Sequence, residues 1–408
     1  MPSVASVEEI RAHFPALSRR HNGHPVAYFD GPGGTQVPRQ VAEAVGDYLL
    51  NHNANTHWEY PSSRETDAAI AAARAALADW LGAEPEEIVF GANMTTLTFH
   101  LGRALGRTLG PGDVLLITEL DHHANADTWR ALARERGLEV RTVRLRAEDG
   151  RLDEEDLARK LTRGVRLFAF GAASNALGTV NDVARLAAQA HAVGALAFVD
   201  AVHYASHQSC DVRAWDCDFL ACSPYKFYGP HLGVLWGRRA LLAGLEPPKL
   251  APAADSVPDK LETGTLSHEG IVGAGAAVEF LASLARGPAP RRERLRLVSR
   301  ELHARGAELL GKLWHGLAAV RGVTLYGPPP GTERTATLVF TLAGHDSAAV
   351  ARHLAGRGVF VSNGDFYAST VARVYGREAD GFVRAGCAVY TTSDEVERLL
   401  AGVRELAA

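Results

Sequence analysis

The chain has 408 residues, of which 43 are basic and 47 acidic, and 47% of it is hydrophobic. A chain of this length and composition can bury two hydrophobic cores, so we expect two domains. The formal net charge of −4 leaves no basic excess, so neither nucleic acid nor a membrane surface is an expected partner.

The N-terminal residues predict a short helix and no targeting segment. Met1–Leu17 lacks a charged stretch followed by an apolar run, and no span approaches about 18 uninterrupted apolar residues. We therefore expect a cytoplasmic protein. Ser6-Val7-Glu8-Glu9 is a capping box, which predicts a helix that ends near Pro15 within an N-terminal arm, residues 1–27.

Strand and helix patterns then alternate from about Tyr28 to Trp236. One example is the apolar run Val114–Thr118, which precedes a helical segment around Trp129. Such alternation is typical of an α/β fold with a doubly wound, mostly parallel sheet. We predict that this sheet belongs to a large domain over residues 28–260.

The remaining residues predict a smaller C-terminal α/β domain. Prolines from Pro247 to Pro258 break the alternating pattern, and residues 261–290 are assigned to an inter-subunit loop and connecting segment. A long helix from roughly Arg294 to Val320 then begins the small domain, residues 291–408. Its other expected elements are strands at Val323–Leu325, Ala336–Thr341 and Gly381–Ala385, and helices at Asp346–Arg357 and Ser393–Leu406.

Lys226 lies in a stretch that the sequence predicts to be buried. In Asp218–Pro230, an apolar strand runs into a Ser-Pro turn and then into a lysine flanked by aromatic residues. Desolvation there would depress the ammonium pKa and leave a nucleophilic amine near neutral pH. This is the setting of a Schiff-base lysine. The alternative is a surface lysine where a strand ends.

Asp200 ends the apolar run Ala195–Asp200, which is typical of a buried parallel strand. Ligands of open α/β sheets gather at the carboxyl ends of strands, and a buried acid there needs a cation or a donor. The protonated ring nitrogen of pyridoxal phosphate would supply one. The alternative is a turn acid or helix N-cap.

A third segment, Glu87–Leu97, predicts a short strand, small residues and then a helix that begins near Thr95. Backbone amides and hydroxyls at such a helix N-terminus can bind an anion. No Walker lysine and no Gly-x-Gly-x-x-Gly are present, which disfavours a nucleotide loop. The alternative is an ordinary N-cap by Thr95 or Asn93.

Four motifs together resemble a known family. They are Asp121-His122-His123-Ala124-Asn125, Ser174–Thr179, Val199–His203 and Ser223–Pro230. The chain resembles class V aminotransferase-fold enzymes of the cysteine desulfurase and selenocysteine lyase type, particularly a desulfurase-like branch without the catalytic cysteine. The resemblance runs from Tyr28 to the final helix. It implies pyridoxal 5'-phosphate as cofactor, the fold type I of such transferases, and a homodimer.

The resemblance also implies roles for the residues around the cofactor ring. Lys226 would form the Schiff base and move the Cα proton, His123 would stack on the ring, and Asp200 would pair with the ring nitrogen. Asn175 and His203 would lie near the ring hydroxyl, although the family more often has Gln at the latter position. Taken without the family, His123 reads as a loop histidine and Asn175 as a turn residue.

Further positions would bind the cofactor phosphate and the substrate. Thr95, Ser223 and the backbone at Met94 would hold the phosphate, and Tyr225 stands where the desulfurases usually carry a histidine. Thr265 and His268 resemble the segment that reaches the phosphate of the neighbouring subunit. The remaining substrate residues are His57, which resembles a substrate-side histidine, and Arg384, which would grip the α-carboxylate with a bidentate fork. On its own, Arg384 also fits a solvated surface charge.

The chain departs from the desulfurases in one loop. In the stretch Val359–Ala368, Ser362 stands at the arginine position and Tyr367 at the position of the nucleophilic cysteine. A phenol cannot replace a thiolate as a sulfur acceptor. Asp365 and Tyr367 are candidates for contacting the substrate side chain, and a plain packing role for Tyr367 is the alternative. Asp365 would favour a cationic or donor-bearing substrate.

The cysteines and histidines predict no further chemistry. Cys387 is expected to point into the small-domain core, Cys222 reads as a small apolar residue of a strand, and Cys210 and Cys217 lie in the connection before it. No Cys-x-x-Cys or His-Glu-x-x-His spacing is present, so we expect no disulfide framework and no metal site.

These observations favour a pyridoxal phosphate-dependent C–S or C–Se β-lyase that acts on an amino acid. An epimerase or an aminotransferase of the same fold is the first alternative, since loss of the Cα proton can lead to either outcome. A non-catalytic scaffold or regulatory subunit is the second. Intact Lys226 and Arg384 argue against a scaffold, which needs no clamp for a substrate carboxylate.

Overall fold

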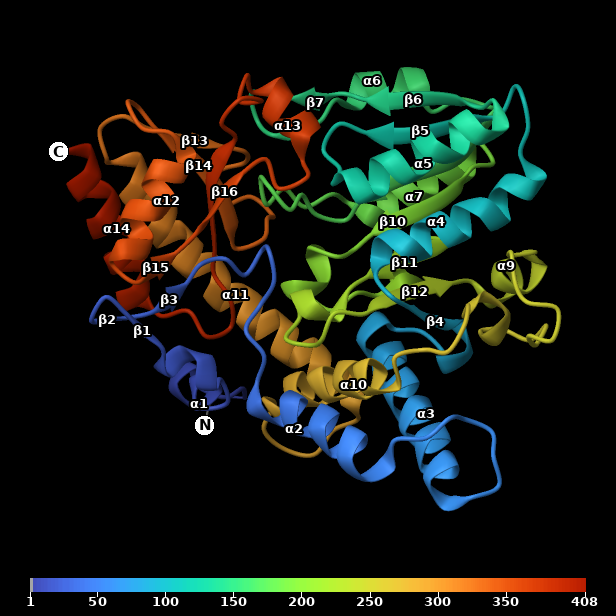
Figure 1. Ribbon diagram of the computed structural model, residues 1–408. Helices are drawn as coiled ribbons and strands as arrows, with labels where there is room; N and C mark the ends of the chain where they lie inside the picture. The colour runs from blue at the N-terminus through green and yellow to red at the C-terminus, as the bar shows by residue number, and fades with distance from the viewer. Residues whose placement is uncertain (1–2) are drawn as a thin grey trace.

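A computed structural model describes residues 3–408 and contains a large central sheet (Figure 1). Its seven strands run in the order β4-β12-β11-β10-β9-β5-β6. Strands β11, β10, β9, β5 and β6 pair in parallel, whereas β12 is antiparallel to both β11 and β4. The predicted doubly wound, mostly parallel sheet is therefore confirmed. The strands are β4 (Ile88–Gly91), β5 (Val114–Thr118), β6 (Glu139–Val143), β9 (Val165–Gly171), β10 (Leu196–Asp200), β11 (Phe219–Cys222) and β12 (Gly233–Gly237).

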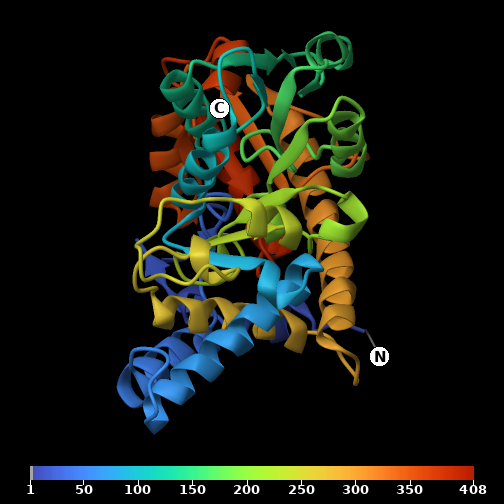
Figure 2. The same ribbon diagram turned by 90° about the vertical axis from the view of Figure 1, so that its right-hand side faces the viewer.

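Apolar side chains leave both faces of this sheet, which explains the unbroken apolar runs in the sequence. In β10, Phe198 packs with α4 (Met94–Leu105) and α5 (His123–Arg136), while its neighbours Ala197 and Val199 belong to a cluster on the other face. That second cluster also contains α3 (Pro61–Leu81), α7 (Val183–Ala192) and α10 (His268–Ser283). Alternate residues of one strand face opposite sides, so both faces must be covered by helices (Figure 2).

The C-terminal part forms a second sheet in the order β13-β14-β17-β16 with its own apolar core. Helix α11 (Arg291–Ala318) joins the two parts, because Leu295 packs in the large core and Leu313 in the C-terminal core. Ala27 and Phe29 also lie in the C-terminal core, since β3 (Ala27–Tyr28) pairs with β15 (Val359–Phe360). The remaining elements here are β13 (Val323–Tyr326), β14 (Thr337–Leu342), β16 (Ser362–Gly364), β17 (Phe382–Gly386), α12 (Ser347–Gly356), α13 (Ser369–Val374) and α14 (Ser393–Ala407).

The structure refines two features of the predicted domain organisation. Residues 261–290 are not only a loop and connection, because α10 lies within them and is largely buried against the large core. The long helix begins at Arg291, close to the expected position. The predicted N-terminal capping box is confirmed, with Glu9 N donating to Ser6 Oγ at 3.2 Å and Ser6 N donating to the Glu9 carboxylate at 2.7 Å.

Short elements complete the chain. They are α1 (Val7–Arg11), α2 (Arg39–Asp47), α6 (Glu154–Lys160), α8 (Val212–Trp215), α9 (Arg239–Gly244), β1 (Arg20–His21), β2 (His24–Pro25), β7 (Leu145–Arg146) and β8 (Arg151–Leu152). Within residues 3–408, no helix has both the length and the apolar character needed to cross a membrane. The same residues contain no group of three or more His, Cys, Asp or Glu side chains placed to hold a metal ion.

Candidate active site

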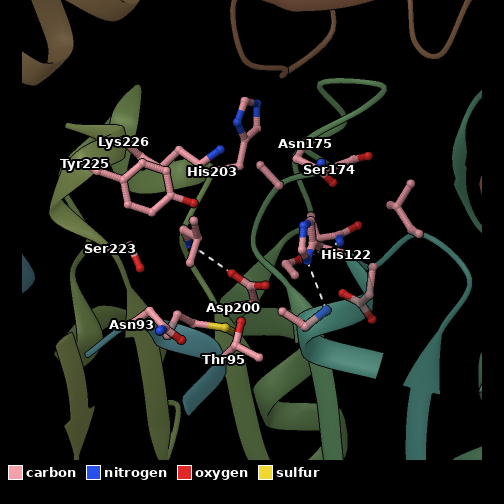
Figure 3. A pocket seen from close by; sticks show the side chains of 18 residues that line it. Asn93, Thr95, His122, Ser174, Asn175, Asp200, His203, Ser223, Tyr225 and Lys226 are labelled. Carbon is pink, nitrogen blue, oxygen red and sulfur yellow. Dashed lines mark hydrogen bonds between the residues drawn. The ribbon is translucent and has the colours of Figure 1, made fainter. Parts of the chain in front are cut away.

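A cavity lies at the carboxyl edge of the large sheet (Figure 3). Asp200 is the last residue of β10, Asn175 follows β9, His122 follows β5, and Lys226 follows β11. Parallel strands end at the same edge, so residues far apart in the sequence converge there. We call this cavity the inner chamber; its lining also includes Asn93, Met94, Thr95, Asp121, Ser174, His203, Ser223 and Tyr225.

Lys226 lies on a short 3₁₀ turn, Pro224–Lys226, and is only 7% exposed. Burial lowers the pKa of its amine to about 7, the positive charge of Arg384 adds to this effect, and Asp200 opposes it. The amine donates a hydrogen bond to the carbonyl oxygen of Pro32. A buried amine that loses its proton near neutral pH can act as a nucleophile and as a base.

The pKa of Lys226 predicts how the attachment of pyridoxal phosphate depends on pH. Below about pH 7 the rate of attachment should rise about tenfold per pH unit, because only the unprotonated amine reacts, and above that value it should level off. The measurement is the rate at which cofactor-free protein forms an adduct with pyridoxal phosphate that borohydride can fix. A rate that keeps rising toward the pKa of an ordinary lysine would contradict the burial argument.

Asp200 forms the floor of the chamber, between the walls that carry Lys226 and His122 (Figure 3). It is 8% exposed, and its Oδ1 accepts a hydrogen bond from the backbone N–H of Val202 at 2.9 Å. Burial raises the pKa of this carboxyl to about 6, whereas the hydrogen bond and the charge of Lys226 lower it. A buried carboxylate is stabilised by a cation, and a protonated pyridine nitrogen would provide one.

Two other chamber residues carry buried polar atoms that have no partner in the described structure. They are Oδ1 of Asn175 and Nδ1 of His203. The remaining polar atom of each side chain has a hydrogen-bond partner. Asn175 Nδ2 donates to the Phe366 carbonyl at 2.9 Å, and His203 Nε2 lies 3.0 Å from Thr335 Oγ1. Buried polar groups are normally paired, so two unpaired ones in a single chamber fit a polar ligand.

The first turn of α4 supplies an anion site to the same chamber. Asn93 caps the helix by accepting from the Thr96 N–H at 2.8 Å, which leaves the amides of Met94 and Thr95 at the helix start. Thr95 and Ser223 also line the chamber with their hydroxyls. Unpaired amides, hydroxyls and the positive end of the helix dipole suit a phosphate group. Together, these donors and the Lys226–Asp200 pair fit pyridoxal phosphate.

The structure places His122, and not the predicted His123, in the inner chamber. His122, the N-cap of α5, lines the inner chamber, and its Nδ1 accepts from the Ala124 N–H at 3.0 Å. His123 is the first helical residue and turns outward, where its Nδ1 pairs with Asp127 at 2.7 Å and its Nε2 lies 3.2 Å from Thr370 Oγ1. Adjacent residues at a helix start point in different directions, so a shift of one position moves the ring out of the chamber.

Electrostatics also favour His122 as the residue beside a cofactor ring. Burial and then the charge of Lys226 lower the pKa of His122 to about 4, so its imidazole is neutral at neutral pH. A neutral aromatic ring can stack on another ring without placing a second cation beside Lys226. Neither composition nor periodicity could separate the two histidines, because the choice depends on where the helix begins.

Arg384 lies on β17, is 4% exposed, and faces a second cavity that opens outward from the chamber. Its Nη1 donates to the Asn175 carbonyl at 3.0 Å, and the Phe366 ring covers its guanidinium with the centroid 4.0 Å from Cζ. Burial lowers its pKa to about 9, which leaves it a cation at neutral pH. We call this second cavity, of about 640 Å³, the outer cavity. It contains Lys226 and Arg384, as a site for an amino acid requires.

Asp365 is not among the residues that line either cavity, so its contact with the substrate stays a prediction. One carboxylate oxygen accepts from the Tyr367 N–H at 3.1 Å, and the other accepts from the Ser369 hydroxyl. The carboxylate therefore holds the turn before α13. Tyr367 does line the outer cavity.

Three predicted site residues lie away from Lys226 within one chain. His57, Thr265 and His268 line a separate surface cavity. His57 is highly exposed and lies 3.2 Å from Asp67, whereas His268 is buried and its Nδ1 lies 3.3 Å from the Tyr48 hydroxyl. Their roles stay predictions, and those of Thr265 and His268 require a second subunit.

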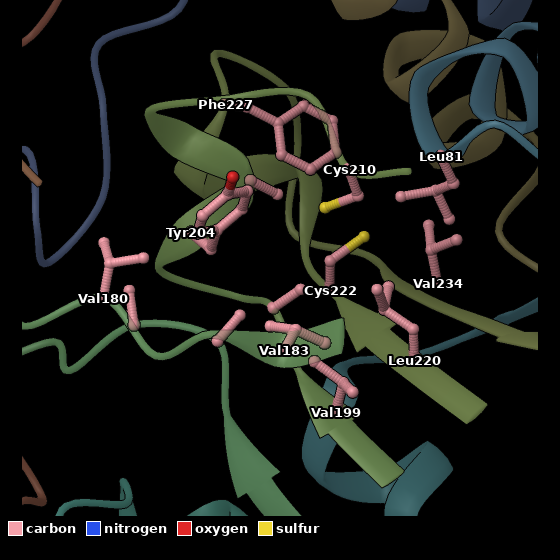
Figure 4. Packing of buried hydrophobic residues seen from close by; sticks show 14 of the residues in the cluster. Leu81, Val180, Val183, Val199, Tyr204, Cys210, Leu220, Cys222, Phe227 and Val234 are labelled. Atoms are coloured by element: carbon pink, nitrogen blue, oxygen red, sulfur yellow. The ribbon is translucent and has the colours of Figure 1, made fainter. Parts of the chain in front are cut away.

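All four cysteines are free and buried, and burial raises the pKa of each thiol. Cys210 and Cys222 lie near each other in the large core beside Phe227 and Tyr204 (Figure 4). Cys387 packs in the C-terminal core, as the strand pattern predicted. A buried thiol of raised pKa is a poor nucleophile.

Two residues at the cavities are not among the predicted site residues, Asp121 in the inner chamber and Phe366 in the outer cavity. Asp121 is fully buried next to Asp200, and burial raises its pKa to about 7, although hydrogen bonds from Thr118 and Asn125 partly offset this. Phe366 covers Arg384 from a loop that carries no motif. The acid before the His-His pair was a usable signal for Asp121, whereas nothing local marked Phe366.

Comparison with known proteins agrees with this geometry. The family model described as aminotransferase class-V matches residues 27–399. A cysteine desulfurase from Pectobacterium carotovorum is 36% identical over 98% of both chains, and one from Dickeya dadantii is 34% identical over 98% of this chain and 96% of its own. Among solved structures, apo cysteine desulfurase from Thermococcus onnurineus superposes with a TM-score of 0.89 at 28% identity, covering 100% of this chain and 99% of its own. Cysteine desulfurase CsdA from Escherichia coli gives 0.85 at 28%, covering 99% and 98%.

Proposed function

Because the chain belongs to the aminotransferase class-V family of pyridoxal phosphate-dependent enzymes, we propose that it cleaves the Cβ–S or Cβ–Se bond of a cysteine derivative by β-elimination. The observation that supports this proposal most directly is that none of the cysteines has an accessible thiol. Each of the chain's four thiols is buried, and the family resemblance implies that Tyr367 would stand at the position of the desulfurase cysteine. Sulfur would therefore leave as a free thiol or persulfide.

When bound, pyridoxal phosphate supplies an electron-withdrawing ring that acidifies the Cα–H bond of the substrate. Asp200 would keep the ring nitrogen protonated, and His122 would cover the ring face. Arg384 would bind the α-carboxylate and so orient the Cα–H bond toward Lys226.

In the proposed reaction, the Lys226 amine removes the Cα proton, the electron pair of that bond forms a Cα=Cβ double bond, and the Cβ–S bond breaks with its pair on sulfur. The leaving thiolate then takes a proton. The released enamine isomerises to an imine, which water hydrolyses to pyruvate and ammonia. The step is redox-neutral and needs water as its only co-reactant.

The test is product analysis by mass spectrometry after incubation of the cofactor-loaded protein in deuterated water with L-cysteine, cystine and a cysteine S-conjugate. Pyruvate with a released thiol or persulfide is the expected result. Alanine with a persulfide on the protein would overturn the proposal and indicate a desulfurase. Uncleaved substrate with deuterium at Cα would indicate an epimerase, and a keto acid that retains its side chain would indicate an aminotransferase. No exchange with any of these substrates would contradict the proposal and mean either another substrate class or a silent site, as in a scaffold.

The two adjacent histidines provide a matched pair of variants. His122→Ala should weaken cofactor binding and lower kcat by about 10- to 100-fold, because a ring that lines the inner chamber is lost. His123→Ala should change the cofactor dissociation constant by less than about threefold, since the His123 side chain lies outside the inner chamber, where its Nδ1 contacts Asp127. The measurements are the cofactor dissociation constant by fluorescence and kcat. Equal losses in both variants would contradict the assignment.

We also infer a homodimer whose second subunit completes the site. Thr265 and His268 line a surface cavity that is separate from the inner chamber, and large apolar side chains such as Leu50, Trp58 and Leu250 are exposed on the single chain. Exposed apolar side chains of this size favour an interface. A monomer by light scattering that still binds the cofactor tightly would contradict this inference.

A further inference from the structure

The walls of the outer cavity determine where a substrate side chain can go. The substrate α-amine would join the cofactor in the inner chamber beside Lys226, and Arg384 would bind the α-carboxylate, so two of the four substituents on Cα would be placed. The side chain must then extend along the walls that the inner chamber does not share. Those walls include Phe99, His123, Asp127, Thr128, Phe366 and Tyr367.

The charges on these walls do not suit an acidic side chain. His123 is paired with Asp127, which also accepts from Arg130 at 2.9 Å. Lys226 would be attached to the cofactor, so among the described residues that line the outer cavity Arg384 is the permanent cation, and the α-carboxylate would occupy it. A second carboxylate would lose its hydration without gaining a partner, which is unfavourable.

Aromatic rings dominate the outer end of the cavity. Tyr367 is 72% exposed, and its ring lies beside that of His122 with a centroid distance of 5.5 Å and an interplanar angle of 33°. Phe366 is fixed with one face on the Arg384 guanidinium. A largely exposed ring next to a second ring, at the mouth of a cavity, offers apolar surface that a ligand can cover.

The backbone of this loop is held in an unfavourable conformation. Phe366 and Tyr367 have φ values of 60° and 55°, in the left-handed region that non-glycine residues rarely adopt. Hydrogen bonds hold both carbonyl groups, since the His123 N–H donates to Tyr367 O at 2.8 Å and Asn175 Nδ2 donates to Phe366 O at 2.9 Å. Strained backbone that is held in this way tends to occur at functional sites.

We propose that Phe366 and Tyr367 form the binding wall for an aromatic group carried on the Cβ substituent of the substrate, and that the enzyme selects S-aryl conjugates of cysteine over small or acidic cysteine derivatives. This inference rests on the proposed function, because the S-aryl group would be the leaving group of the β-elimination. The recognition itself needs only an amino acid with a ring at that position.

The test therefore separates binding from cleavage. L-homophenylalanine has the shape of S-phenyl-L-cysteine with a methylene in place of sulfur, and L-norvaline likewise mimics S-methyl-L-cysteine, so neither has a leaving group. The cofactor-loaded wild-type protein should bind homophenylalanine at least about tenfold more tightly than norvaline in a spectral titration. S-phenyl-L-cysteine should exceed S-methyl-L-cysteine in kcat/KM by a similar factor.

Variants of the wall should remove this preference. Tyr367→Ala should reduce the binding ratio to about threefold or less, and Phe366→Leu should also lower it, whereas Tyr367→Phe keeps the ring and should retain it. Thermal denaturation confirms that each variant is folded. An unchanged ratio in both ring-deleting variants, or no preference in the wild-type protein, would overturn the proposed wall.

The two proposals fail in different ways. Preferential binding of homophenylalanine that depends on Tyr367, without cleavage of S-phenyl-L-cysteine, would support the wall and contradict β-elimination. Cleavage of both conjugates at equal kcat/KM, with no binding preference, would support β-elimination and overturn the wall.

Discussion

Replacing Lys226 with alanine should lower kcat by about 10³–10⁴-fold or more, because the same amine attaches the cofactor and removes the Cα proton. The amine is buried in the chamber beside Asp200, and the other described residues of the chamber offer no second lysine. The variant should still bind pyridoxal phosphate through Asp200 and the first turn of α4. It should not retain the cofactor covalently after borohydride treatment.

A second buried lysine provides the control. Lys260 is 9% exposed, and its Nζ donates to the Ala243 carbonyl at 2.7 Å, outside both cavities. Lys260→Ala should lower thermal stability but keep covalent attachment and the pH dependence of Schiff-base formation. Mass spectrometry of the borohydride-treated proteins decides between the two lysines. A fixed adduct in the Lys226→Ala variant would contradict the assignment.

Replacing Arg384 with glutamine should lower kcat/KM for an amino acid by about 100-fold, and Arg384→Lys should recover only part of this loss. Hydrogen bonds to a charged group each contribute about 1.5–3 kcal/mol, and lysine cannot form the bidentate pair. The Phe366 ring and the Asn175 carbonyl hold the guanidinium in place, so a shorter or more mobile cation would not reach the same position.

Two comparisons make the Arg384 prediction specific. The wild-type protein should bind an α-amino acid far more tightly than the corresponding amine without a carboxylate, and the Arg384 variants should lose this difference. Arg334→Lys is the matched control, because Arg334 is also 4% exposed but bonds to backbone carbonyls, including Leu177 O at 3.0 Å. It should lose stability and keep the carboxylate preference. If the Arg384→Gln variant still preferred the amino acid over the amine, the assignment of Arg384 to the α-carboxylate would be contradicted.

The order of apolar and polar residues along the chain was enough to predict the large sheet and the two site residues at the ends of its strands, Asp200 and Lys226. Asp200 ends one strand and Lys226 follows another, and alternate residues of both strands are buried on the two faces of the sheet, which leaves an unbroken apolar run in the sequence. A polar residue at the carboxyl end of such a run is a local signal. The motifs around both residues then allowed the family to be recognised, which the matches over residues 27–399 confirm.

The sequence by itself therefore determined the fold class, the cofactor chemistry and the positions of Lys226 and Asp200, because each depends on neighbours along the chain. The tertiary structure decided that His122 rather than His123 faces the chamber, that Asp365 holds a turn, and that Phe366 covers Arg384. Those outcomes depend on where a helix begins and on how a loop of the C-terminal part packs against the large sheet. Contacts between residues about 200 positions apart, such as Asn175 with Phe366, leave no local pattern in a single sequence.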